Sequence, residues 1–203
     1  MGIKINLGSG FTRIDGFINI DEDPRVYPDY VIQLDDPNIR LPFDENSVEE
    51  IHCFHLLEHI GQGFIPLIKE LYRVCQHGSI FDIEVPNETH SMFYGDPTHV
   101  RPITVAGMTL FSRKYCLDHI ERYHSYNGLA LTQQVDFEII WFGFTYDEFY
   151  RPMLEDFFKR KDEGKVSQEE DFKIQRLLRE ANNVAMHTKI KMVAIKEYPD
   201  GSK

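Results

Sequence analysis

The stretch KINLGSGFTRIDGFINID, residues 4–21, decides the fold. An apolar strand runs into Gly8-Ser9-Gly10, and a second apolar segment ends on Asp21. In open α/β sheets, ligands bind beyond the carboxyl ends of the strands. Glycines there let a ligand approach the backbone closely, and an acid after the second strand can accept both hydroxyl protons of a ribose. This stretch therefore predicts a site for a nucleoside-type cofactor.

The same stretch disfavours a dinucleotide. A G-x-G-x-x-G fingerprint would place its third glycine where this chain has Arg13, with the acid about 20 residues on. Only residues 11–15 separate Gly10 from Gly16, too few for a crossover helix. Because no helix N-terminus is expected to hold a pyrophosphate, a cofactor with a ribose and no phosphate fits better, and a nicotinamide-dependent reductase is disfavoured.

The rest of the chain alternates short apolar runs with helical patterns, which is typical of an α/β protein. The chain has 203 residues, 42% of them hydrophobic, and we predict one domain over residues 1–203. The expected helices are residues 64–76, 112–123 with Ser112 as N-cap, and 167–181 with Ser167 and Glu170 as a capping box. The expected strands are residues 4–8, 17–21, 30–35, 50–56, 79–85, 137–144 and 188–198.

From residue 3 to about residue 102 the sequence resembles the Rossmann-type, or class I, S-adenosylmethionine-dependent methyltransferases. INLGSG resembles the first motif of that family and INID its acidic second motif. YVIQLDD, followed by LPFDENSVEEIHCFHLLEHI, resembles the third and fourth. The resemblance implies a Rossmann-like methyltransferase fold: a mostly parallel seven-stranded sheet with helices on both faces and one antiparallel strand. The chain departs from the family at Asn6, where an acid is usual, and at Thr12, where a third glycine is common.

The resemblance also implies roles for individual residues. The glycine loop would face the methionine part of S-adenosylmethionine, and Asp21 would bind its ribose. His55, after the fourth strand, would lie near the transferred methyl group. Three further residues are candidates for binding the adenine: Gln33, Leu34 and Asp35.

His55, Glu58 and His59 spell H-x-x-E-H, a spacing that some zinc peptidases use. Such a site needs both histidines on one helical face, but residues 51–55 alternate as a strand does. We therefore predict no metal site and keep a zinc-dependent hydrolase as an alternative.

The segment YGDPTHVRPIT, residues 94–104, follows the fifth strand and concentrates polar side chains in a loop. His99 is a candidate general base or substrate-orienting residue, since an imidazole suits proton transfer near neutral pH. Arg101 is a candidate clamp for a carboxylate or phosphate of the substrate, and Asp96 a further substrate contact. The alternative is an ordinary turn held by Asp96.

A helical insertion is expected at about residues 147–186, between the last two strands. Its apolar residues fall at helical spacing, which favours packing on the sheet or in a homodimer. A substrate lid is the second interpretation.

Composition and charge limit which binding partners and which cellular compartment we expect. The net charge of −11 disfavours nucleic acid. No apolar run is long enough to span a membrane, and no signal peptide is expected. Three scattered cysteines favour a reduced, cytoplasmic protein.

We predict an S-adenosylmethionine-dependent methyltransferase acting on an O or N nucleophile of a small molecule. A protein that binds S-adenosylmethionine or S-adenosylhomocysteine without catalysis is the main alternative.

Overall fold

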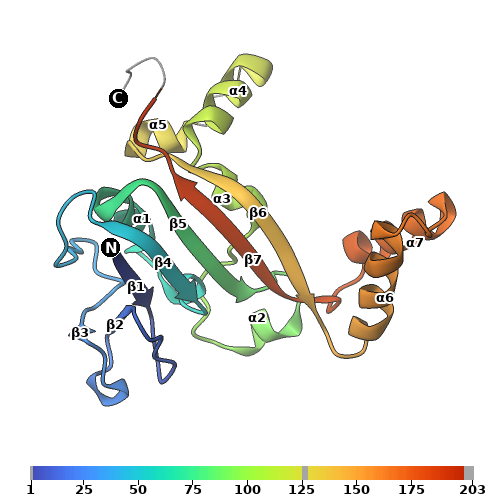
Figure 1. Ribbon diagram of the computed structural model, residues 1–203, viewed down its shortest axis with the longest axis horizontal. Helices are drawn as coiled ribbons and strands as arrows, with labels where there is room; N and C mark the ends of the chain where they lie inside the picture. The colour runs from blue at the N-terminus through green and yellow to red at the C-terminus, as the bar shows by residue number, and fades with distance from the viewer. Residues whose placement is uncertain (1, 125–127, 199–203) are drawn as a thin grey trace.

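The computed structural model describes residues 2–124 and 128–198. A seven-stranded sheet runs through it in the order β3-β2-β1-β4-β5-β7-β6 (Figure 1). Neighbouring strands pair in parallel except where β7 is involved, because β7 is antiparallel to both β5 and β6. The predicted fold class, a mostly parallel sheet with one antiparallel strand and helices on both sides, is confirmed. The strands are β1 Ile3–Leu7, β2 Ile18–Asp21, β3 Tyr30–Val31, β4 Val48–Phe54, β5 Cys75–Pro86, β6 Phe137–Tyr146 and β7 Ala185–Ala194.

Helices enter mainly in the second half of the chain. They are α1 Phe64–Val74, α2 Ser91–Gly95, α3 Val105–Thr109, α4 Arg113–Tyr123, α5 Leu129–Gln133, α6 Arg151–Asp162 and α7 Gln168–Glu180, with short 3-10 turns η1 Pro24–Val26 and η2 Leu57–His59. In Figure 1, α1 and α3 lie behind the central strands, while α6 and α7 project beyond the ends of β6 and β7. Residues 8–17 form no helix, as the short spacing predicts.

The core lies between the sheet and α1. Alternate side chains of β1 and β4, among them Leu7 and Ile51, are fully buried together with Leu67 and Leu71 of α1. Every second residue of a strand faces the same side of the sheet, and apolar residues three or four positions apart lie on one side of a helix. These two faces pack against each other here. The burial fixes which strand residues point toward α1 and which point away from it.

The opposite face of the central strands carries charges paired across neighbouring strands. Lys4 Nζ lies 2.6 Å from Glu50 Oε2, and Lys191 Nζ lies 2.9 Å from Asp82 Oδ2. Lys189 Nζ lies 2.9 Å from a carboxylate oxygen of Glu84. These side chains are partly exposed, which explains why β4, β5 and β7 alternate apolar with charged residues.

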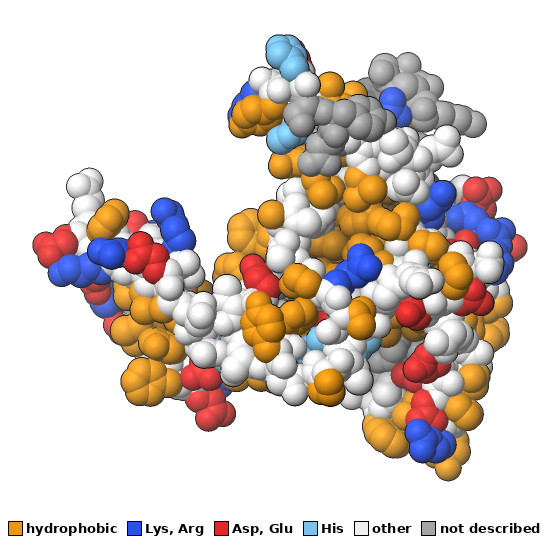
Figure 2. Space-filling model, turned by 180° about the vertical axis from the view of Figure 1, so that it is seen from behind, with side chains coloured by type: hydrophobic (Ala, Val, Ile, Leu, Met, Phe, Trp, Pro, Cys, Tyr) orange, Lys and Arg blue, Asp and Glu red, His pale blue; other side chains and the backbone are white. Residues whose placement is uncertain are grey.

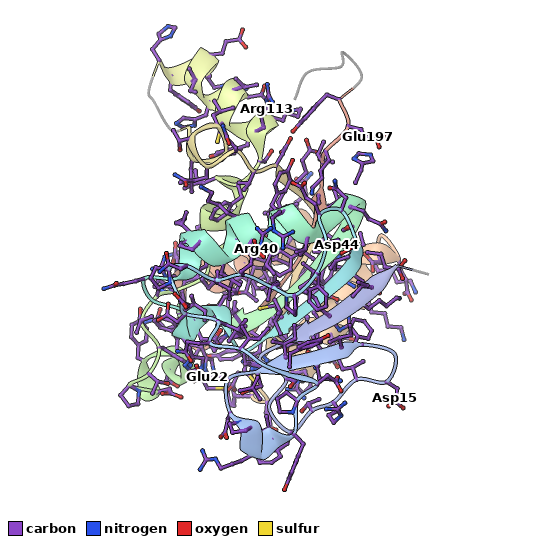
Figure 3. The ribbon with its side chains drawn as sticks, turned by 90° about the vertical axis from the view of Figure 1, so that its left-hand side faces the viewer. Asp15, Glu22, Arg40, Asp44, Arg113 and Glu197 are labelled. Carbon is purple, nitrogen blue, oxygen red and sulfur yellow. The ribbon has the colours of Figure 1, made fainter. Side chains whose placement is uncertain are left out.

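Several boundaries differ from the sequence-based expectation. The strand expected at residues 30–35 stops at Val31, and the chain continues as a loop to residue 47. Arg40 and Asp44, labelled in Figure 3, lie in this loop, which runs along α1. Helix α1 ends at Val74 rather than at residue 76, because the residues around Gly78 (φ +82°) already belong to β5.

The predicted N-caps are confirmed. Ser112 Oγ accepts a hydrogen bond from Tyr115 N, and Ser167 Oγ accepts one from Glu170 N. The second half of the predicted capping box differs, since the Glu170 carboxylate instead pairs with Arg160 at 2.6 Å. A charged partner outcompetes the backbone N–H of the cap.

Within the described residues, no helix is both long and apolar enough to cross a membrane. The cysteines at positions 53, 75 and 116 are free thiols, and each is buried.

Candidate functional site

The glycine loop leaves β1 in a left-handed backbone conformation. Gly8 has φ +63° and Gly10 has φ +48°, values that glycine adopts without strain. A Cβ on Gly8 would lie 3.0 Å from the Leu56 side chain, so this loop packs closely against the segment that follows β4. A Cβ on Gly10 would meet nothing within 4 Å, which leaves open space beside the loop.

Asp21 joins the glycine loop to the end of β2. Its Oδ2 accepts a hydrogen bond from Gly10 N at 2.8 Å, and its Oδ1 accepts one from Asp23 N at 2.9 Å. A carboxylate offers about four lone-pair positions, so each oxygen retains capacity for a hydroxyl donor. The side chain is partly exposed. Asp21 and the loop thus lie together, as the sequence predicts, and the carboxylate oxygens can accept hydrogen bonds from hydroxyl groups.

Two buried asparagines form hydrogen bonds that support the glycine loop. Asn6 Nδ2 donates to Thr12 O at 3.0 Å and to Asn19 Oδ1 at 2.9 Å. Asn19 Oδ1 also accepts from Ile14 N at 3.0 Å. Asn6 therefore holds the loop in shape. Ser9 Oγ, also buried, has no hydrogen-bond partner among the described residues.

The three residues predicted to meet the adenine have different environments. Gln33 is exposed, whereas Leu34 is 3% exposed and belongs to the core. Asp35 Oδ1 accepts a hydrogen bond from Gly63 N at 2.7 Å, which places its carboxylate at the start of α1. An acid there favours the helix through its dipole. Of the three, only the Gln33 side chain is freely exposed.

The H-x-x-E-H segment forms a strand end and a turn. Strand β4 ends at Phe54, His55 has φ +53°, and η2 begins at Leu57. The two histidines therefore do not share a helical face, and each joins a different group of candidate ligand atoms. His55 lies with Glu84 and His187, while His59 lies with Glu58 and His99. The geometry expected of a zinc peptidase is not formed.

The group around His55 lies where β4, β5 and β7 meet. The His55 and His187 rings are 4.9 Å apart, and His187 Nδ1 lies 3.5 Å from Glu84 Oε1. The Glu58 carboxylate raises the pKa of His55 above its ordinary value, against the effect of burial. Burial lowers the pKa of His187, and nearby His55 lowers it further. Sequence reasoning missed Glu84 and His187, because their approach depends on the antiparallel register between β5 and β7.

The loop after β5 brings its predicted residues beside η2. His99 is largely buried and contacts the His59 ring, with centroids 4.7 Å apart. Hydrogen bonds from Thr98 lower the pKa of Asp96. The guanidinium of Arg101 donates to the carbonyl oxygens of residues 60 and 61 and lies 4.4 Å from the centre of the Phe64 ring. These contacts give the Arg101 guanidinium a role in holding its own loop.

A hollow of about 850 Å³ lies between the end of β6 and α6. Its lining includes Thr145, Tyr146, Arg151 and Phe158. Thr145 Oγ1 lies 2.9 Å from His187 Nδ1, which connects the hollow to the group around His55. Figure 2 shows the α6–α7 lobe projecting from the body of the protein, with acidic and basic side chains over its outer end.

No protein-family model matches this sequence, and no curated protein sequence is significantly similar to it. Solved structures do match its fold. A SAM-dependent methyltransferase from Archaeoglobus fulgidus aligns with a TM-score of 0.57 at 17% identity, covering 95% of this chain and 86% of that one.

Two further structures extend the comparison. Phosphoethanolamine N-methyltransferase 2 from Haemonchus contortus, solved with phosphomonomethylethanolamine and S-adenosylhomocysteine, has a TM-score of 0.53 at 13% identity, over 97% of this chain and 49% of that one. The cyclase SpnF has a TM-score of 0.51 at 13% identity, over 96% of this chain and 76% of that one. This chain therefore has the Rossmann-like fold of the S-adenosylmethionine-dependent methyltransferases.

Proposed function

We propose that this protein is a methyltransferase that moves the methyl group of S-adenosylmethionine to an O or N nucleophile of a small-molecule acceptor. The observation that carries the proposal is the glycine loop closed on Asp21 at 2.8 Å, at the carboxyl ends of β1 and β2. That position is where sheets of this strand order bind ligands. The methyltransferases of the same fold, one of them solved with S-adenosylhomocysteine, support the choice of cofactor.

The cofactor, when bound, supplies a methyl group already activated on a sulfonium. The protein's task is then to exclude water and to align the acceptor with the methyl group. In this proposal the backbone at Gly8, Ser9 and Gly10 faces the methionine part, and Asp21 accepts the ribose hydroxyl protons. Gln33 borders the adenine.

On the acceptor side, we assign the residues that follow β4 and β5. His55, exposed after β4, lies nearest the transferred methyl group in this proposal. His99 serves as the base where the nucleophile starts protonated, and Asp96 with Arg101 contacts the acceptor. The α6–α7 insertion, which borders the hollow at β6, is proposed as a lid or a homodimer contact.

The test is turnover of S-adenosylmethionine labelled in its methyl group, assayed against alcohols, phenols, amines and carboxylates. We expect labelled product with at least one acceptor class. We expect an Asp21→Asn protein to lose most of that turnover, because its amide accepts ribose hydroxyls more weakly than a carboxylate does. The matched control is Glu22→Gln, which alters the adjacent exposed carboxylate, labelled in Figure 3.

A second candidate is a protein that binds S-adenosylmethionine or S-adenosylhomocysteine without transferring the methyl group. It is favoured by Asn6, since the acid usual at that position is replaced by an amide committed to the loop backbone. The cyclase SpnF also shares the fold. Saturable binding of S-adenosylhomocysteine, with no labelled product from any acceptor class, would support this candidate over the first.

A further inference from the structure

The carboxylate of Glu58 is buried without a hydrogen-bond partner in the described part of the chain. Its side chain is 1% exposed, and neither Oε1 nor Oε2 accepts a hydrogen bond from any described residue. The nearest ion-pair contact, His55 Nδ1, lies 3.6 Å from Oε1, beyond hydrogen-bond length. An ionised carboxylate in this state is costly, because burial removes its hydration and the partial replacement is the His55 imidazole at 3.6 Å. A bound cation would remove that cost.

Two histidines converge on the same carboxylate. One ligand atom each from Glu58, His59 and His99 lies within 4.8 Å of the others. These residues come from η2 and from the loop after β5, so their meeting is a product of the tertiary fold. Two imidazoles and one carboxylate form a ligand set that suits transition-metal ions better than it suits Mg²⁺ or Ca²⁺.

Among the described residues, the side-chain hydrogen bonds of both rings are made through Nδ1, and His99 Nε2 lies 3.9 Å from Asp96 Oδ2. His99 Nδ1 lies 2.7 Å from Phe93 O, which can only accept, so Nδ1 carries the proton. His59 Nδ1 lies 2.9 Å from Thr98 Oγ1, whose own proton goes to Asp96 Oδ1 at 2.6 Å. In its neutral form each imidazole would therefore carry its proton at Nδ1 and present an Nε2 lone pair. A carbonyl or hydroxyl behind each ring is the outer contact that metal-binding histidines use.

The backbone holds the two ligand segments together. Val100 N donates to Glu58 O at 2.9 Å, and Arg101 N approaches the same oxygen at 3.3 Å. The Arg101 guanidinium donates to Gly61 O at 2.9 Å. The loop carrying His99 is thus anchored on the turn carrying Glu58 and His59, so the site is largely formed before an ion binds.

We propose that Glu58, His59 and His99 bind one divalent transition-metal ion, with Zn²⁺ as the representative ion. A tetrahedral ion with bonds of ~2.1 Å places its ligands roughly 3.4 Å apart, so the side chains would draw together on binding. Three protein ligands leave one coordination position for a water molecule or for an oxygen atom of the methyl acceptor. The site differs from the H-x-x-E-H pattern, because His55 is replaced by His99. It does not depend on methyl transfer, although a metal-bound His99 could not serve as the base.

The test is calorimetric titration of ZnCl₂ into the full chain after chelator treatment, with zinc content measured on the same protein after dialysis. We expect one ion per chain. His59→Gln and His99→Gln should each weaken binding by more than about 100-fold, since even outer contacts contribute 10–100-fold. His187→Gln and His124→Asn serve as controls that remove one imidazole elsewhere, and both should bind as the original protein does.

A variant outside the metal ligands distinguishes loss of zinc binding from loss of folding. Thr98 is exposed, so Thr98→Val should fold normally yet weaken zinc binding about 10-fold by releasing His59 Nδ1. Zinc should also raise the thermal midpoint of the original protein by mass action, and less so in Thr98→Val. The proposal is overturned by absence of stoichiometric zinc, by binding that Thr98→Val and the ligand variants leave unchanged, or by binding that His187→Gln abolishes.

Discussion

A buried ion pair fastens the long loop between β3 and β4 onto α1. Glu70, whose side chain is 6% exposed, accepts hydrogen bonds from Arg73 at 2.7 and 2.8 Å and from Leu41 N at 2.7 Å. Arg73, 15% exposed, also donates to Phe43 O at 2.9 Å. The charged centre of the network lies on α1, and hydrogen bonds to Leu41 and Phe43 connect it to the loop. Removing one charge while keeping the shape tests its contribution to stability.

We expect Glu70→Gln to lower the free energy of unfolding by about 3 kcal/mol. Breaking a buried pair costs roughly 3–5 kcal/mol, and the low end applies because Arg73 keeps its carbonyl partner and Gln can still accept from Leu41 N. For a chain of this length, that corresponds to a fall in thermal midpoint of roughly 6–12 °C. Urea unfolding followed by circular dichroism measures it.

The matched control is Glu169→Gln on α7. Glu169 and Lys173 form an ion pair at 2.7 Å with both side chains at least 70% exposed. Exposed pairs of this kind contribute about 0.5 kcal/mol or less. A loss below about 1 kcal/mol for Glu70→Gln, or a loss equal to that of the control, would refute the reasoning.

Three further outcomes follow from the same structure. Gly8→Ala should lower stability by about 1–2 kcal/mol, because φ +63° is unfavourable for alanine and its Cβ would press on Leu56; an unchanged urea midpoint would contradict this. Burial alone would raise the pKa of Glu70, but hydrogen bonds from Arg73 and Leu41 hold it below its ordinary value of 4.5. The stability that Glu70 contributes is therefore present above about pH 4.5 and lost as the pH falls through its folded pKa, so the difference from Glu70→Gln should shrink in acid; a difference constant from pH 7 to pH 3 would argue otherwise. Burial raises the pKa of the Cys75 thiol to about 12, so iodoacetamide at pH 8 should label it only after unfolding, as read by mass spectrometry; rapid labelling of the folded protein would be inconsistent with its burial.

The sequence predicted the glycine loop more fully than any other part. The apolar strand, the two glycines and Asp21 lie within residues 4–21, so local spacing alone determines their arrangement. The absence of a helix between β1 and β2 also followed from counting residues. By contrast, the end of β3 at Val31 depends on how the loop packs on α1, which local pattern does not reveal.

The histidine groups could not be read from the sequence. The strand alternation of residues 51–55 predicted that His55 and His59 do not share a helical face, and the positive φ at His55, where the chain turns, could not be predicted from that pattern. His99 reaches Glu58 only because loop 96–101 is bonded to the turn after β4. His187 reaches Glu84 only through the register of an antiparallel pair that is distant in sequence. Tertiary contacts decide the placement of His99 and of His187.

The most direct test of the proposed function is a calorimetric titration of S-adenosylhomocysteine into the purified protein and its Asp21→Asn variant, with Glu22→Gln as control. We expect saturable binding to one site per chain, unaffected by Glu22→Gln. Asp21→Asn should weaken it about 10–100-fold, as expected for loss of charge-assisted hydrogen bonds. Absence of binding, or equal affinity in the Asp21→Asn variant, would contradict the assignment of the glycine loop as the cofactor site.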